Sequence, residues 1–103
     1  KRIKHIHKND KMLYNYFTKT FGGGISGKPL KESSLILASE AVKHVKKRKP
    51  KQEFHVIRTG GIESIGDILE SDRSGVSMNQ WFTGYFDNLA RHGHRLYKKL
   101  LEN

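Results

Sequence analysis

The chain has 103 residues, with 20 Lys and Arg against 10 Asp and Glu, a hydrophobic share of 35% and no cysteine. This length fits one domain and falls far short of the roughly 250 residues of a complete (β/α)₈ barrel. The lack of cysteine excludes a disulfide framework, a thiol nucleophile and a cysteine metal site. The sequence predicts neither a membrane span nor secretion, because no apolar run approaches about 18 residues and nothing resembles a signal peptide.

The net charge of +10 suggests a negatively charged partner, such as nucleic acid, an anionic membrane surface or a phosphorylated ligand. Two segments carry this charge: residues 1–20 have a net charge of +5, and residues 43–51 have a net charge of +6. The second segment coincides with a predicted helix end, where cations are favoured by the helix dipole. Solvated surface is the simpler interpretation of both segments.

Residues 1–21 are basic and polar and show no clear apolar period, so we predict a basic arm or irregular segment there. Its aromatic residues are Tyr14, Tyr16, Phe17 and Phe21. A loop over residues 21–30 follows, because glycines crowd this stretch and Pro29 forbids an uninterrupted helix.

A helix is expected next, with Ser33 or Ser34 as its N-cap, a basic end at Arg48 and Pro50 as its stop signal. Residues 54–59 then read as a short strand, because apolar and β-branched residues are bounded there by a glycine pair.

A second helix is predicted from Ser64, with Asp67 at the spacing of a capping box and Gly75 after its end. Residues 76–82 form the second strand candidate, and a final helix is expected over about 87–101. Strands that alternate with helices predict parallel βα units rather than a sandwich or a bundle.

Three turns of small residues recur along the chain, at Gly24–Gly27, Thr59–Gly61 and Thr83–Gly84. The last two follow predicted strands and precede helices. Backbone N–H groups can converge there on phosphate oxygens, and the hydroxyls of Ser26 and Thr83 add to the attraction. Each turn alone is a weak signal, but their order predicts a phosphate-bearing ligand.

Residues 23–30, 56–67 and 74–84 together resemble the C-terminal part of the dihydroorotate dehydrogenases. The resemblance covers about residues 22–101, and the Ser-Gly-Lys-Pro-Leu form at 26–30 is similar to the quinone-dependent, membrane-associated class. It implies an α/β fold in which residues 22–103 are the C-terminal portion of a (β/α)₈ TIM barrel. This portion holds the last two βα units, so the barrel is incomplete in this chain.

The resemblance also implies FMN as cofactor, a flavin that carries out the redox chemistry while the protein positions it. Gly60 and Gly61 would then bind the flavin phosphate through their N–H groups, and Phe82 would approach the phosphate or the flavin edge. The complete set of expected cofactor-binding residues is Ser26, Gly27, Thr59, Gly60, Gly61, Phe82 and Thr83.

In the whole enzyme, the resemblance implies oxidation of dihydroorotate to orotate in pyrimidine biosynthesis, with a quinone as acceptor. The location would be cytoplasmic or peripheral to an inner membrane. The family's catalytic base and substrate-binding residues lie upstream of the matched region, so we assign no catalytic residue and expect this chain alone to be inactive. The missing barrel portion or self-association would cover its exposed strands.

Two departures from the family stand out. Arg58 replaces a residue that is commonly small, and it could crowd the flavin or grip its phosphate. Residues 1–20 show no match to the family.

A different class of function is a small basic module that binds nucleic acid through its lysines and through Tyr14, Tyr16 and Phe17. That hypothesis leaves the glycine turns unexplained. His5 and His7 could bind a metal, but the sequence offers no third ligand. Trp81 fits a core aromatic better than a ring-stacking residue.

Overall fold

The computed structural model describes residues 6–102, so His5 and the other first residues of the expected arm lie outside the described part. The helices are α1 (Lys11–Phe21), α2 (Lys31–Arg48), α3 (Ile65–Arg73), α4 (Thr83–His92) and α5 (Leu96–Leu101), and the strands are β1 (Ile57–Thr59) and β2 (Met78–Gln80). Short 3₁₀ turns precede α1, α2 and α5.

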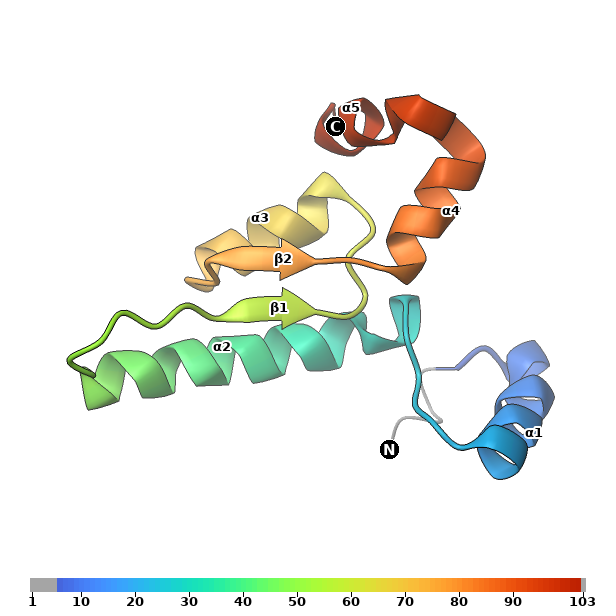
Figure 1. Ribbon diagram of the computed structural model, residues 1–103, viewed down its shortest axis with the longest axis horizontal. Coiled ribbons are helices and arrows are strands. Elements are labelled where there is room, and N and C mark those ends of the chain that lie inside the picture. Colours follow the sequence, from blue (N-terminus) through green and yellow to red (C-terminus); the bar gives the residue numbers. More distant parts are fainter. Residues whose placement is uncertain (1–5, 103) are drawn as a thin grey trace.

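The two strands are parallel, with Ile57 opposite Met78 and Thr59 opposite Gln80. Since α3 connects them, β1, α3 and β2 form one βαβ unit, as the alternation of elements predicts. Figure 1 shows α2 and α3 lying along the two strands, whose carboxyl ends point toward the start of α2 and the start of α4.

One side of the sheet is open. Ile57 and Met78 are about half exposed, at 46% and 57%. The core between the sheet and the helices is small and consists of Ala38, Val42 and Val76, with Val56 packed against them. The radius of gyration is 15.7 Å, against about 13 Å for a compact domain of this length. The fold therefore leaves apolar surface uncovered.

Arg58 is 1% exposed and is the largest fully buried side chain among the described residues. Its Nε donates to Ser34 Oγ (3.0 Å), and its Nη2 donates to the Lys31 carbonyl (2.8 Å). Its Nη1 donates to Ser71 Oγ (2.9 Å) and to the Asp67 carbonyl (3.0 Å). One guanidinium thus joins β1 to both α2 and α3.

The expectation that Arg58 approaches the ligand is wrong, for a simple geometric reason. Side chains alternate along a strand. Ile57 and Thr59 point to the open face of the sheet, so Arg58 points to the helices.

The prediction of an irregular segment over 1–21 is also wrong for residues 11–21, which form α1. Polar side chains lie on one side of this helix, and apolar or aromatic ones recur at three- and four-residue intervals on the other. The helical period is hard to recognise in the sequence, because aromatic residues alternate with lysines and other polar residues in this segment.

Other boundaries differ from the predictions. Helix α2 begins at Lys31, after a 3₁₀ turn that contains Pro29, so neither Ser33 nor Ser34 is its N-cap. The expected final helix begins at Thr83 and breaks at Gly93, whose φ of 56° favours glycine. Both strands are shorter than expected.

We expect Arg58→Met to lower the free energy of unfolding by about 3 kcal/mol, because four oxygens would each lose the hydrogen bond that the guanidinium donates. Urea denaturation measures this. The exposed Arg95→Met is the matched control and should change stability by less than about 0.5 kcal/mol. Equal effects of the two substitutions would contradict the role of Arg58.

Candidate phosphate-binding site

The three glycine turns converge at the carboxyl ends of β1 and β2 (Figure 1). A Cβ on Gly27 would lie 2.9 Å from Thr83 Cγ2, which places the first turn against the start of α4. A Cβ on Gly84 would lie 2.2 Å from the Ile62 carbonyl oxygen, which places the second turn against the same helix. The structure therefore brings together segments that the sequence separates by up to 57 positions.

Two hydroxyls meet at this point. Ser26 Oγ lies 2.9 Å from Thr83 Oγ1, and both side chains are exposed to solvent. Thr83 is the first residue of the ten-residue helix α4. The first N–H groups of a helix have no intrahelical acceptor, and the dipole there favours an anion. The arrangement can bind a phosphate through hydroxyls and N–H groups together.

Gly60 and Gly61 have φ angles of 110° and 77°, which favour glycine. A Cβ on Gly61 would lie 2.4 Å from the backbone N and Cα of Lys31, and one on Gly60 would lie 3.2 Å from the Leu30 side chain. These glycines make room for the start of α2. Within residues 6–102, neither of their N–H groups donates to the backbone of another turn or loop.

Thr59 and Phe82 stand at the edge of the three turns. Thr59 lies on the open face of the sheet, where its hydroxyl is 3.4 Å from Gln80 Oε1. Phe82 is 71% exposed and contacts Phe86 edge to face. Their exposure leaves both side chains accessible to a ligand.

Trp81 packs away from the three glycine turns. Its ring packs against Tyr85 of α4 and Tyr97 of α5, with centroid distances of 5.7 and 5.9 Å. It therefore links the two C-terminal helices, which agrees with a packing role.

The capping box predicted at Ser64 and Asp67 is confirmed. Asp67 Oδ2 accepts from the N–H groups of Glu63 (2.9 Å) and Ser64 (3.0 Å). Lys31 Nζ lies 3.1 Å from Asp67 Oδ1, a contact that only tertiary structure creates. Burial would raise the pKa of Asp67, but the Glu63 N–H, the Lys31 ammonium and the Ser64 hydroxyl outweigh it, so this pKa falls below 3.8.

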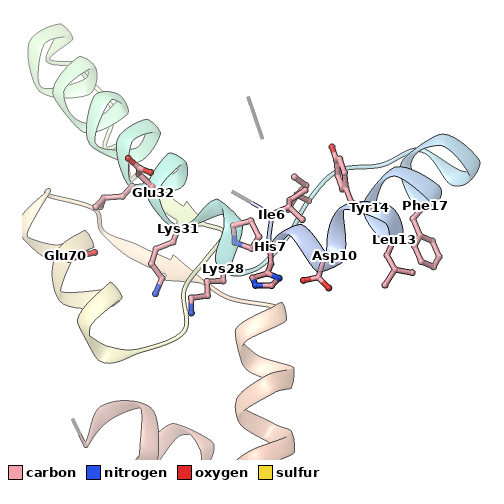
Figure 2. Close-up of a pocket in the computed structure, with 13 residues that line it drawn as sticks. Ile6, His7, Asp10, Leu13, Tyr14, Phe17, Lys28, Lys31, Glu32 and Glu70 are labelled. Carbon is pink, nitrogen blue, oxygen red and sulfur yellow. The ribbon is translucent and has the colours of Figure 1, made fainter. Parts of the chain in front are cut away.

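A groove of about 1070 Å³ lies elsewhere, between α1 and the start of α2 (Figure 2). Its apolar lining includes Leu13, Phe17, Ile25 and Leu35. None of the seven expected cofactor-binding residues lines it. The groove adjoins the first glycine turn through Ile25 and Lys28 but includes none of the expected cofactor-binding residues.

The described residues offer no group of three His, Asp or Glu side chains that could hold a metal ion. In the same part of the chain, no helix combines the length and the apolar character that crossing a membrane requires.

We expect Gly84→Ala to destabilise the fold by about 3 kcal/mol, because its Cβ would overlap the Ile62 carbonyl. Gly66→Ala is the matched control in α3, where the added methyl meets only Ser64 Oγ at 3.5 Å, and it should be neutral or stabilising by up to about 1 kcal/mol. Thermal unfolding compares the two. A Gly84→Ala protein as stable as Gly66→Ala would disprove the close approach of the two turns.

The lowered pKa of Asp67 predicts a pH dependence of stability. Because the folded pKa lies below 3.8, the ionised carboxylate stabilises the fold fully above pH 3.8, and this stabilisation is lost as the pH falls through the folded pKa. The stability advantage of wild type over Asp67→Asn should therefore be constant near neutral pH and shrink below pH 3.8. An advantage that grows on acidification would contradict this sign.

Comparison with known proteins identifies the family. The sequence model of the dihydroorotate dehydrogenase family matches residues 3–102, so the expectation that residues 1–20 lie outside the family is wrong for residues 3–20. None of the solved structures gives a significant match.

Two bacterial relatives are named dihydroorotate dehydrogenase (quinone). The protein of Pasteurella multocida is 31% identical over 80 residues, which cover 78% of this chain and 21% of the relative. The protein of Haemophilus influenzae (strain PittEE) is 32% identical over 81 residues, which cover 79% of this chain and 21% of the relative. This chain thus spans about a fifth of the length of these relatives.

A third relative, from Lachancea kluyveri, is named dihydroorotate dehydrogenase (quinone), mitochondrial. It is 37% identical over 67 residues, which cover 65% of this chain and 14% of the relative. With the family match over nearly all of its residues, the chain belongs to the dihydroorotate dehydrogenase family.

Proposed function

We propose that the three converging turns bind the phosphate of FMN in a dihydroorotate dehydrogenase-like oxidoreductase. The observation that carries this proposal is the meeting of Ser26 and Thr83 hydroxyls, 2.9 Å apart, at the start of α4 and beside the turn that follows β1. Two of the predicted segments place hydroxyl groups at one point, and the turn after β1 lies beside the same helix through Ile62.

The residues at this point fit a phosphate monoester. Hydroxyls from Ser26 and Thr83 and N–H groups at the start of α4 are donors, and the N–H groups of Gly60 and Gly61 add to them. The exposed ring of Phe82 lies next to Thr83 and would face the flavin edge. FMN, when bound, supplies the hydride chemistry, while these residues hold its phosphate and fix its orientation.

The open sheet face supports a second part of the proposal, that residues 22–103 are the last βα units of a TIM barrel. Ile57 and Met78 are apolar, exposed and on the side of the sheet that no helix within residues 6–102 covers. In a closed barrel this side is filled by inward-facing side chains from other strands. We expect that missing portion, or a second copy, to cover the face, and the chain alone to be inactive.

The substrates of the whole enzyme follow from the relatives' names. We propose dihydroorotate as the electron donor and a quinone as the acceptor, as those names state for the relatives. Because quinones dissolve in membranes, we propose that the enzyme works at a membrane surface. The catalytic base belongs to the part of the family's barrel upstream of these residues, so no residue here is assigned to proton abstraction.

Titration with FMN, followed by flavin fluorescence, tests the site. We expect saturable binding that inorganic phosphate relieves and that riboflavin, which lacks the phosphate, does not reproduce. Thr83→Val keeps the side-chain shape and removes one donor to an anion, so it should weaken binding about tenfold or more. The matched control is Thr20→Val, on the exposed surface of α1.

Two results would contradict the proposal. One is riboflavin binding as tightly as FMN, which would exclude a phosphate contribution. The other is equal affinity of Thr83→Val and wild type. Since Thr83 is exposed, its substitution should leave the fold intact, and circular dichroism checks this.

A further inference from the structure

The hydroxyl of Ser34 connects a buried cation to the glycine turn that follows β1. Ser34 Oγ lies 3.0 Å from Arg58 Nε and 2.7 Å from the Gly60 carbonyl oxygen. Ser34 is 9% exposed and Arg58 is 1% exposed, so water has little access to these bonds. Two consecutive hydrogen bonds therefore lead from the guanidinium to the turn.

Arg58 fixes the direction in which the Ser34 hydroxyl donates. A guanidinium nitrogen can only donate, so Ser34 Oγ is the acceptor of that bond and keeps its single hydrogen for another oxygen. Two carbonyl oxygens lie within reach, that of Gly60 at 2.7 Å and that of Lys31 at 3.2 Å. The Lys31 carbonyl already accepts from Arg58 Nη2. The hydrogen therefore goes to Gly60, the nearer acceptor.

The bond from Ser34 sets the orientation of the peptide group that joins Gly60 to Gly61. No peptide bond among the described residues is cis, and in a planar trans peptide the C=O and the N–H point in opposite directions. Since the Gly60 carbonyl points to Ser34, the Gly61 N–H points away from it. A peptide between two glycines has more rotational freedom than any other, so an external anchor decides where this N–H points.

Arg58 also places an unpaired positive charge close to the turn. Its four hydrogen-bond acceptors are uncharged hydroxyl and carbonyl oxygens, which belong to Ser34, Ser71, Lys31 and Asp67. Within residues 6–102 it forms no ion pair, because Glu63 and Asp67 pair with Lys31 instead. Hydrogen bonds that start at a charged donor polarise the groups along the chain. The Gly61 N–H is thus a stronger donor to an anion than an isolated peptide N–H.

We propose that Ser34 is a positioning residue for the FMN phosphate: held by Arg58, it fixes the Gly60–Gly61 peptide so that the Gly61 N–H donates to the anion. The inference rests on the proposed function for the identity of the ligand. Ser34 itself does not touch the flavin or its phosphate. Arg58, whose side chain points to the helices, acts on the phosphate through Ser34 and not by contact.

Ser34→Ala tests this inference, and Ser71→Ala is its matched control. Ser71 is likewise buried, and its hydroxyl also accepts from Arg58, at 2.9 Å, but it donates to the Asp67 carbonyl and not to the glycine turn. In magnetic resonance spectra of the ligand-free full chain, Ser34→Ala should shift the Gly60 carbonyl carbon and the Gly61 amide nitrogen, because that carbonyl loses its hydrogen bond. Ser71→Ala should leave both signals in place.

Titration with FMN measures the consequence for the phosphate. Ser34→Ala should bind FMN about tenfold more weakly than wild type, because one donor to an anion is no longer held in place. Its affinity for riboflavin should not change, and Ser71→Ala should bind FMN as wild type does. Circular dichroism checks that both variants are folded. Arg58→Met is less suitable, because the loss of stability expected above would affect the whole fold.

Two results would overturn the inference while the proposed function stands. They are equal FMN affinity of Ser34→Ala and wild type, and equal shifts of the Gly60 and Gly61 signals in the two variants. Wild type that binds riboflavin as tightly as FMN would overturn the proposed function and with it the phosphate role of Ser34. The ligand-free signals would then still show whether Ser34 holds the peptide, so the two failures are distinguishable.

Discussion

The buried guanidinium of Arg58 is the interaction on which the arrangement of this chain depends. The apolar core is too small to position two helices alone, since it consists of a few alanine and valine side chains. Arg58 adds directional bonds from β1 to the Lys31 carbonyl and Ser34 of α2, and to α3 through Ser71. A buried charge is costly unless its donors are satisfied. Here each nitrogen has an oxygen partner, so the same group that costs desolvation also specifies where the helices lie.

The candidate site inherits its shape from this packing. The start of α2 fills the space beside Gly60 and Gly61, where a side chain would collide with Leu30 or Lys31. Asp67 then fixes the backbone just after these glycines, because its carboxylate accepts from the Glu63 N–H. Gly84 lets α4 approach the same stretch of backbone at Ile62. The close approach of neighbouring backbone thus requires glycine at Gly61 and Gly84, and at Gly60 the Leu30 side chain leaves little room for a Cβ. Under the proposed function, one geometry serves both packing and phosphate binding.

Local sequence signals predicted much of this fold. Alternating elements, the Ser64 and Asp67 capping box and the order of the glycine turns all follow from neighbouring residues, and the structure confirms the first two. Contacts between distant segments could not be predicted. Arg58 resembles a ligand-binding cation until the alternation along β1 turns it toward α2, and the Ser34 hydroxyl resembles an N-cap although it donates to the Gly60 carbonyl. The seven expected cofactor-binding residues stay predictions, because the structure shows Ser26 and Gly27 against Thr83 but does not test ligand binding.

Hydrogen exchange of the full chain with and without FMN would test the central claim most directly, because it locates the binding site among backbone N–H groups. The account predicts slower exchange confined to residues 24–27, 60–63 and 82–86, the three turns that meet at the start of α4. The effect should be reduced when inorganic phosphate competes. Unchanged exchange at saturating FMN, or protection concentrated in the basic residues 43–51, would contradict the account.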